Sequence, residues 1–454
     1  MKVSLQFLPD NKKEEIFYYG LVRLIDYYYL LTSYICRGGT MTATLAEPEN
    51  TSAVSHVETV ASLAQEWAKR RPNQIALREK DFGIWQEYSW AKTWDLIVDA
   101  AHALLALNIE PGDRVSIQSE DRPEWVILDL AAVAVRGVTV GLYPTNPTAE
   151  VEYLLTDCGS SIHFAEDQEQ VDRVLEIEPS VLPDLKHILY TEPRGVVSYD
   201  DDRLLYWEDF LEIGRNHRKE YGGAVDKRMA EAQGDDVMTL VYTSGTTGVP
   251  KGVLLSHANL IAAGTNVAVA HKLTPADTSM CVLPIYHING LCVTVMGSLV
   301  SSGGLVIPRR FSARHFWAQM HKFNCSWFSA VPTLFAYLLN DDAKSVLDRK
   351  RLRFARSASA PLPPEIHRQF EKRFSIPIIE TMGLTETGAQ ILSNPLPPEI
   401  RKIGSPGTAY GNEIMVGDEK QNPVATNQEG EILVRGSNVM QGYLDRPEET
   451  AKTI

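Results

Sequence analysis

The segment YTSGTTGVPKG, residues 242–252, contains the residue types that could most directly do chemistry. It follows a short apolar run and precedes a helical pattern that begins near Ser256. Backbone N–H groups and hydroxyls in such a loop can surround phosphate oxygens, and Lys251 supplies a compensating positive charge. The segment therefore predicts a phosphate-binding loop. The alternative is an ordinary strand-to-helix turn with Ser and Thr on its surface.

The glycine spacing excludes the commoner nucleotide-binding loops. Gly245, Gly248 and Lys251 stand at intervals of three, whereas a Walker A loop has the form G-x-x-x-x-G-K. None of the 30 glycines is followed by another glycine two residues later. The G-x-G motifs of dinucleotide-binding proteins and of protein kinases are therefore absent. The sequence also has no G-x-S-x-G or H-E-x-x-H motif, so neither a serine hydrolase nor a zinc protease is supported.

Three further segments accompany the loop, and together the four are similar to the core motifs of the adenylate-forming superfamily. The segments are LYPTNPTAEVEYLLTDCG (142–159), MGLTETG (382–388) and GEILVRGSNVMQGYLDRPEETA (430–451). That superfamily includes acyl- and aryl-CoA synthetases, luciferases and the adenylation domains of peptide synthetases. The resemblance implies a carboxylate–CoA ligase that uses ATP, Mg²⁺, CoA and a small carboxylic acid.

The resemblance also implies a role for individual residues. The β- and γ-phosphates would be held by Thr243, Ser244, Gly245, Thr246, Thr247, Gly248 and Lys251. Thr385 would hydrogen-bond the α-phosphate, and Glu386 would bring in Mg²⁺, a hard cation that prefers oxygen ligands. His287, in LPIYHINGL, matches a histidine between the acid pocket and the nucleotide. The expected catalytic residues are therefore Lys251, Thr385, Glu386 and His287.

The nucleotide base is expected between two further segments. SASAPLP (357–363) matches a small-residue segment beneath adenine, and the expected contacts there are Ser359, Ala360 and Pro361. On the other face of the base, the expected contacts are Glu380, Thr381 and Met382. Met382 replaces the family's usual aromatic residue, but its thioether can still contact a ring.

The acid itself is less well defined by the motifs. Residues 137–147 and 164–177 resemble bacterial long-chain fatty-acid ligases, whereas 309–333 and 391–407 resemble ligases for oxalate and coumarate. Because the family builds its pocket mainly from the second half, we favour a short, medium or aryl acid, and fatty acids stay open. Two alternatives also stay open: a carrier-protein thiol as acceptor, or a non-catalytic nucleotide-binding protein.

From residue 57 onward, helical periods alternate with short β-branched runs, which predicts an α/β fold with two doubly wound, mostly parallel sheets and covering helices. Strands are predicted at 114–119, 137–144, 161–166, 187–191, 238–243, 279–284, 304–308 and 327–332. Helices are predicted at 57–70, 90–107, 124–136, 147–157, 258–270, 312–323 and 363–374. The expected subdomains are 50–230, 235–375 and a β-rich subdomain at 376–454 that forms a small antiparallel barrel or sheet, with a linker at 214–236.

Composition narrows the class of protein. The chain has 454 residues, 44% of them hydrophobic, and a formal net charge of −14, which disfavours a nucleic-acid partner. Its five cysteines show no paired spacing, so reduced thiols and a cytoplasmic location are expected.

The two ends of the sequence differ from the family pattern. Residues 16–36 hold six of the 18 tyrosines, but Arg23 and Asp26 interrupt this apolar run, so stable membrane insertion is not expected. We interpret residues 1–40 as lying upstream of a natural start at Met41, and an interfacial helix is the alternative. The family continues beyond the counterpart of Ile454 with a mobile domain that carries a lysine for the reacting carboxylate. The expectation is therefore a large domain, 41–454, that binds ATP or an acyl adenylate but turns over slowly or not at all.

Overall fold

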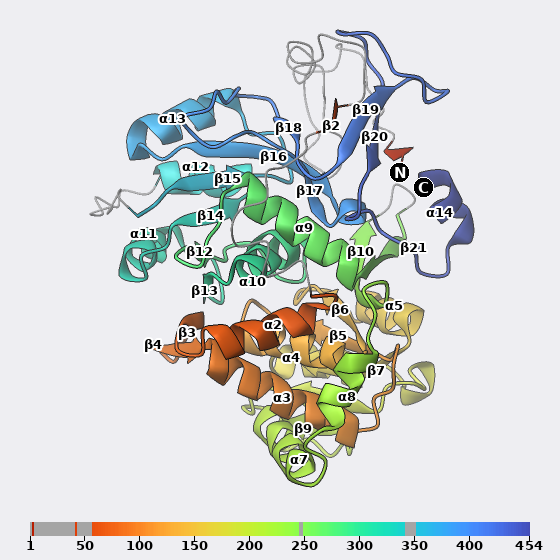
Figure 1. The fold of residues 1–454 in the computed structure, drawn as a ribbon. Helices are drawn as coiled ribbons and strands as arrows, with labels where there is room; N and C mark the ends of the chain where they lie inside the picture. The colour runs from red at the N-terminus through yellow and green to blue at the C-terminus, as the bar shows by residue number, and fades with distance from the viewer. Residues whose placement is uncertain (1, 4–40, 43–56, 245–247, 341–350) are drawn as a thin grey trace.

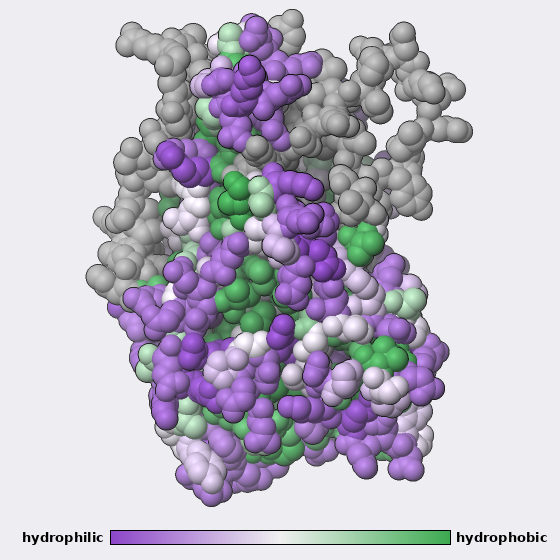
Figure 2. Space-filling model, turned by 90° about the vertical axis from the view of Figure 1, so that its right-hand side faces the viewer, coloured by the Kyte–Doolittle hydropathy of each residue, from purple (hydrophilic) through white to green (hydrophobic). Residues whose placement is uncertain are grey.

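The computed structural model describes residues 2–3, 41–42, 57–244, 248–340 and 351–454. Figure 1 shows two stacked lobes, a lower one drawn in orange to yellow-green and an upper one in green to blue. Seen from the side on which β21 and α14 lie, apolar residues gather midway up the molecule and polar residues surround them (Figure 2). The predicted residues Gly245, Thr246 and Thr247, and nearly all of the segment 1–40, lie outside the described ranges.

The lower lobe is built on a sheet of eight described strands. In spatial order these are β21 (Gly442–Tyr443), β11 (Pro250–Ser256), β10 (Val237–Ser244), β6 (Val138–Leu142), β5 (Arg114–Gln118), β7 (Ser160–Ala165), β8 (His187–Tyr190) and β9 (Leu204–Tyr206). The strands from β10 to β9 run parallel, and β11 and β21 add antiparallel pairs at one edge. All six residues of β7 are buried, as expected for a parallel strand covered on both faces.

The upper lobe is built on a sheet of nine described strands. In spatial order these are β18 (Thr408–Ala409), β17 (Ala389–Ser393), β16 (Ile378–Leu384), β15 (Phe354–Ser357), β14 (Trp327–Ala330), β12 (Thr278–Met280), β13 (Gly304–Ile307), β3 (Ile75–Asp81) and β4 (Ile84–Ser89). The centre of this sheet, from β16 to β3, is parallel, and antiparallel pairs close both edges.

Helices separate and cover the two sheets. A central layer shares one hydrophobic core with both sheets and contains α2 (Val60–Arg70), α3 (Trp90–Ala106), α4 (Pro123–Ala134), α9 (His257–Ala270), η4 (Asn289–Met296) and α10 (Gly297–Ser301). The outer face of the lower sheet carries α5 (Thr148–Cys158) and α6 (Gln168–Leu175). The outer face of the upper sheet carries α11 (Ala313–Lys322), α12 (Pro332–Asn340) and α13 (Pro364–Phe374). The predicted α/β class with two doubly wound sheets is therefore confirmed.

All of the predicted strands and helices are present, with their ends shifted by a few residues. Sequence reasoning missed the hairpin β3–β4 and the strands β9, β11, β15, β16 and β17. The four cysteines of the described ranges are free and buried, as expected: Cys158, Cys281, Cys292 and Cys325. No helix of these ranges is long and apolar enough to cross a bilayer, and the apolar run at 16–36 lies outside them.

The predicted division of the chain between the sheets is wrong. The residues that form β10 and β11 were expected in the second block, but they join the lower sheet because β10 pairs in parallel with β6, with Leu240 opposite Val140. β3 and β4, expected in the first block, join the upper sheet because β3 pairs with β13. Each sheet therefore takes strands from both halves of the sequence.

The predicted linker at 214–236 is also wrong, because two helices, α7 (Trp207–Glu220) and α8 (Ala224–Glu231), cover most of it. α7 packs directly on α3: a Cβ at Gly214 would lie 1.9 Å from the Asp99 carbonyl oxygen, so glycine permits the close approach. The charged residues that suggested a linker lie on the exposed side of α7.

Of the two arrangements predicted for the C-terminal region, a barrel or a sheet, the structure contains a small open antiparallel sheet. Its described strands lie in the order β1 (Lys2–Val3), β20 (Glu431–Arg435), β19 (Glu413–Gly417) and β2 (Met41–Thr42). The two edge strands do not pair with each other, so the sheet does not close. The chain ends in the short helix α14 (Pro447–Thr453), which packs beside β21 (Figure 1). Two short 3-10 turns, η3 (Pro179–Val181) and η5 (Thr385–Thr387), complete the element order.

Candidate functional site

The predicted phosphate loop has a paired strand on either side of its undescribed residues 245–247. β10 and β11 pair antiparallel, with Thr243 opposite Lys251 and Ser244 opposite Pro250. Gly248 is exposed at φ 83°, a conformation that favours glycine. The helix α9 begins only after β11, where Ser256 and Asn259 form a capping box. The loop is therefore held by strands on both sides, and the strand-to-helix turn is excluded.

Lys251, on β11, lies against the third motif. Its Nζ is 5.5 Å from the ring centroid of Tyr443, a cation–π distance. Tyr443 stands on β21, which pairs with β11 so that Val253 is opposite Tyr443. β10 and β21 lie close together at the right of Figure 1, and β11 pairs with both of them. The strand pairing therefore fixes the distance between the lysine and the tyrosine.

Tyr443 in turn contacts the second motif. Its Oη donates a 2.8 Å hydrogen bond to Oε1 of Glu386. Burial, together with the charge and hydrogen bond of Glu386, raises the pKa of Tyr443, so the phenol keeps its proton and acts as the donor. The Glu386 carbonyl oxygen accepts a 2.8 Å bond from the Met440 backbone N–H. Three sequence-distant motifs therefore meet at Lys251, Tyr443 and Glu386.

The turn that carries Thr385 and Glu386 is tightly positioned. A Cβ at Gly383 would lie 1.4 Å from the Ala389 carbonyl oxygen, so the hairpin β16–β17 requires glycine there. The Asn438 side chain donates a 2.6 Å bond to the Thr387 carbonyl oxygen, and it ties the turn to the third motif. The Thr385 hydroxyl makes no hydrogen bond with any described residue, so it is available to a ligand.

Glu386 fits the role of a magnesium contact within a nucleotide complex. Oε1 is used by Tyr443, whereas Oε2 has no partner among the described residues. No group of three or more His, Cys, Asp or Glu residues in those ranges could form an all-protein metal cage. One carboxylate oxygen suits Mg²⁺, which is commonly bound by one or two carboxylates and substrate phosphates.

A second cluster contains His287, Asn289 and Ser359. The Asn289 backbone N–H lies 3.2 Å from Nδ1 of His287, and its side-chain Nδ2 donates a 3.0 Å bond to the Ser359 hydroxyl. Ser359 has φ 69° and, like Ala360 and Pro361, is exposed just beyond β15. The structure thus links the predicted acid-side histidine to the predicted adenine-side loop through Asn289.

The protonation state of His287 follows from this contact. Burial lowers the pKa of His287, so the ring is neutral near pH 7. Because Nδ1 accepts a hydrogen bond from Asn289, the proton of the neutral ring is on Nε2. Nε2 has no partner among the described residues, so it can donate to a bound carboxylate.

Glu380 and Thr381 have their side chains engaged inside the fold. The Glu380 Oε1 atom lies 2.9 Å from Nδ1 of His367 and accepts a 2.8 Å bond from the Gly404 N–H. The Thr381 hydroxyl donates to the Ser357 carbonyl oxygen at 3.2 Å. Met382 packs on a small apolar cluster that includes Ile391 and Ile414. Their assignment to the nucleotide stays a prediction.

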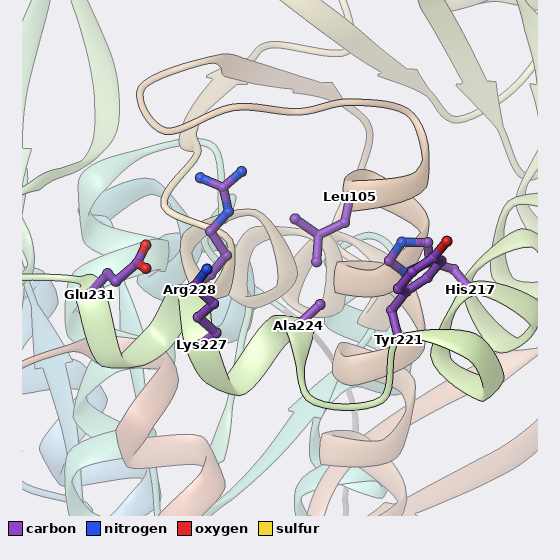
Figure 3. Close-up of a pocket in the computed structure, with 7 residues that line it drawn as sticks. All are labelled: Leu105, His217, Tyr221, Ala224, Lys227, Arg228 and Glu231. Atoms are coloured by element: carbon purple, nitrogen blue, oxygen red, sulfur yellow. The ribbon is translucent and has the colours of Figure 1, made fainter.

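A separate hollow, of about 450 Å³, lies on the lower lobe (Figure 3). It lies between the end of α3 and the helices α7 and α8, and His217, Tyr221 and Arg228 line it. None of the predicted site residues lines this hollow. The motifs therefore define the site independently of it.

Three residues of the site were not assigned from sequence: Tyr443, Asn289 and Arg356. Tyr443 and Asn289 lie inside motifs that were identified, but their side-chain partners are far away in the chain. Arg356 is a charged residue in the middle of the apolar strand β15, directly before SASAPLP, and that position was its available signal.

The two-sheet α/β fold and the meeting of the three motifs are those of a known class of protein, and the chain belongs to the AMP-binding enzyme family. Residues 64–444 match that family's sequence pattern. The chain is 51% identical over 222 residues to the sulfoacetate–CoA ligase of Cupriavidus necator, an alignment that covers 49% of this chain and 43% of that protein. It is 31% identical over 398 residues to the oxalate–CoA ligase of Arabidopsis thaliana, covering 86% and 73%.

A solved structure shows the same fold with a nucleotide bound. The ATP-bound crystal structure of MatB from Rhodopseudomonas palustris matches with a TM-score of 0.71 and 26% identity, over 87% of this chain and 73% of that one. The chain is thus homologous to acid–CoA ligases and to an ATP-binding protein. Its alignment spans less than half the length of the sulfoacetate ligase.

Proposed function

We propose that the chain binds ATP and a small carboxylic acid and forms an acyl adenylate, as part of an AMP-forming carboxylate–CoA ligase. In the first step a carboxylate oxygen attacks the α-phosphorus, the bond from that phosphorus to the bridging oxygen breaks, and pyrophosphate leaves. In the second step the CoA thiol attacks the acyl carbon, its proton is lost, and AMP leaves. Positioning and charge neutralisation dominate such phosphoryl chemistry.

The observation that carries this proposal is the chain of contacts from Lys251 through Tyr443 to Glu386. It places one cation and one carboxylate beside the phosphate-loop hairpin. Lys251 would neutralise the departing pyrophosphate, and the free Thr385 hydroxyl would donate to an α-phosphate oxygen. Glu386 would hold Mg²⁺, which supplies further neutralisation of phosphate charge when it is bound.

His287 would orient the acid. Its Nε2–H is the donor left open by the Asn289 contact, and a neutral imidazole donates a hydrogen bond to a carboxylate while keeping its own proton. Because Asn289 also bonds Ser359, movement of the adenine-side loop would be transmitted to the histidine.

The relatives favour a small acid. Sulfoacetate and oxalate are the acids in the names of the two ligases described above, and each is a short molecule with two anionic groups. We therefore propose a short acid as substrate, in preference to a long-chain fatty acid.

The test is ATP–pyrophosphate exchange by the 454-residue chain with a panel of acids. The panel contains acetate, oxalate, malonate, sulfoacetate, coumarate and octanoate. We expect exchange above the no-acid background with at least one short acid, and a decrease in exchange in Thr385→Val. If the chain is folded and binds ATP but exchanges pyrophosphate no faster with any of these acids than without acid, adenylation would be overturned as the function.

A further inference from the structure

The arginine of β15 is buried without a counter-ion. Arg356 is 1% exposed and lies between two neighbouring strands, opposite Ser329 of β14 and Ile379 of β16. Within the described part of the chain, no carboxylate forms an ion pair with it. Burial lowers the pKa of Arg356 to about 9, so the group is still mostly charged at pH 7. Buried charges are rarely left unpaired, because removing them from water is costly.

The neighbours of Arg356 are neutral, and they leave part of its guanidinium free. Nη1 donates to the Asn289 side-chain oxygen at 3.1 Å and to the Ser329 hydroxyl at 3.0 Å. Nε donates to the Gln390 side-chain oxygen at 3.2 Å. Nη2 donates to no described residue. One complete arm of a planar, charged donor is therefore unused.

A second unused donor lies beside it. The side-chain nitrogen Nε2 of Gln390 is buried and has no hydrogen-bond partner. Because Oε1 of the same amide accepts from Arg356, this nitrogen lies close to the guanidinium. Both unsatisfied groups are donors, one of them charged, so the ligand that would satisfy them is an anion.

The position of Arg356 connects this anion site to the acid. Asn289 accepts from Arg356 through its side-chain oxygen, while its backbone N–H lies against His287 and its side-chain nitrogen bonds Ser359. The guanidinium is thus one residue away from both the predicted acid-orienting histidine and the adenine-side loop. η4, which begins at Asn289, is a π-helix, a distortion common at functional sites.

We propose that Arg356, supported by Gln390, binds a second anionic group of the acid substrate, a carboxylate or sulfonate carried at the end away from the carboxyl that is activated. This inference rests on the proposed function and narrows its substrate class to short acids with two anionic groups. The fork of a guanidinium suits either group, since both present paired oxygens.

The test is equilibrium dialysis of radiolabelled acids against the full chain in the presence of ATP. The di-anionic probes are oxalate, malonate and sulfoacetate, and the matched mono-anionic probes are acetate and propionate. We expect the chain to prefer a di-anionic acid, and Arg356→Met to weaken its binding by about 100-fold, as when one partner of a buried charge pair is removed. Mono-anion binding should change by less than about threefold in Arg356→Met, and Arg356→Lys should be intermediate because it keeps the charge and loses the fork.

Arg353 supplies a matched control. It precedes β15 but is paired with Asp277 at 2.7 Å and with backbone carbonyl oxygens, so Arg353→Gln should leave the preference between acids unchanged. Arg356→Met should remain folded by circular dichroism, because the substitution removes an unpaired buried charge.

Two outcomes would overturn the inference: equal affinity of the wild-type chain for di-anionic and mono-anionic acids, or equal losses for both in Arg356→Met. The second would assign Arg356 a structural role in holding η4 to the sheet. Neither outcome bears on adenylation itself, which pyrophosphate exchange with any acid of the panel would still support.

Discussion

The phenol of Tyr443 donates a 2.8 Å hydrogen bond to the carboxylate of Glu386, although 57 residues separate them in the sequence. Tyr443 stands on the strand that extends the phosphate-loop hairpin, and Glu386 stands on the turn after β16. The bond fixes which oxygen of Glu386 is used by the protein and which is left for a ligand. Metal-assisted nucleotide binding should therefore depend on a residue that touches neither metal nor phosphate.

Tyr443→Phe should weaken Mg²⁺-dependent ATP binding by about 10-fold, because a hydrogen bond to a charged group contributes about 1.5–3 kcal/mol and this one is only partly buried. Binding of AMP without Mg²⁺ should be unchanged. Titration calorimetry measures both affinities. Tyr221→Phe, a substitution on the exposed surface of the lower lobe, is the matched control. Unchanged Mg²⁺–ATP affinity in Tyr443→Phe would show that the bond does not position Glu386.

Glu386→Gln removes the negative charge of the side chain but keeps its hydrogen bond, since the amide oxygen can still accept from Tyr443. The Mg²⁺ concentration needed for half-maximal ATP binding should rise by about 10-fold, because Mg²⁺ prefers a carboxylate oxygen to a neutral amide. A fluorescent ATP analogue titrated with Mg²⁺ gives this concentration directly. The same Mg²⁺ dependence in Glu386→Gln and wild type would remove Glu386 from the metal site.

Lys251→Ala should weaken ATP binding by about 10- to 100-fold and AMP binding by less than about twofold, because the lysine is assigned to the outer phosphates. Lys272→Ala is the control: the Lys272 side chain is exposed and makes a surface ion pair with Glu399 at 3.5 Å. Equal losses for ATP and AMP in Lys251→Ala would place the lysine elsewhere in the nucleotide complex.

The sequence predicted the parallel strands well because most of them are buried on both faces and are rich in apolar and β-branched residues, as in β13. It missed β4, whose six residues are all at least partly exposed, and it misread α7 because the exposed face of that helix is densely charged. The local sequence of β3 and β10 does not show which sheet each strand joins, because each pairs with a strand far away in the sequence.

The candidate site divides in the same way. The motif residues Lys251, Thr385 and Glu386 were identified from short segments, and the fold brings these segments together. Tyr443 and Arg356 act through side-chain partners in other segments, and no local pattern shows such partners. The side chain of Arg356 is buried because η4 packs on that face of the sheet, and Asn289 at the start of η4 accepts a hydrogen bond from its guanidinium.

Buried neutral histidines should make the fold sensitive to acid. Burial lowers the pKa of His163 to about 3, and burial and the Arg356 charge do the same for His271. In the unfolded chain both histidines have a pKa near 6.5. Between pH 6.5 and pH 3 the unfolded state therefore binds more protons than the folded state, and the free energy of unfolding decreases as the pH is lowered. At pH 5 the loss in the free energy of unfolding is about 2 kcal/mol per histidine relative to pH 7.

Urea unfolding at pH 7 and pH 5 measures this loss. His163→Asn keeps a partner for the Ser116 hydroxyl, now 2.8 Å from Nδ1, and removes the titrating ring. The variant should therefore lose about 2 kcal/mol less between the two pH values than wild type. His315→Asn, at an exposed position, should match the wild-type loss. An identical pH dependence in His163→Asn and wild type would contradict a neutral buried ring.

Asn289→Asp tests the role of the unpaired Arg356 charge by giving that charge a counter-ion within the protein. The Asn289 oxygen lies 3.1 Å from Nη1, so a carboxylate there would form an ion pair inside the fold and neutralise the guanidinium. Binding of di-anionic acids should fall by about 10- to 100-fold in Asn289→Asp, because the new carboxylate competes with and repels the second anionic group. Asn289→Ala removes the side-chain contacts without adding charge, and its loss should stay within a few-fold. Wild-type affinity for oxalate and sulfoacetate in Asn289→Asp, measured by equilibrium dialysis, would separate Arg356 from acid recognition.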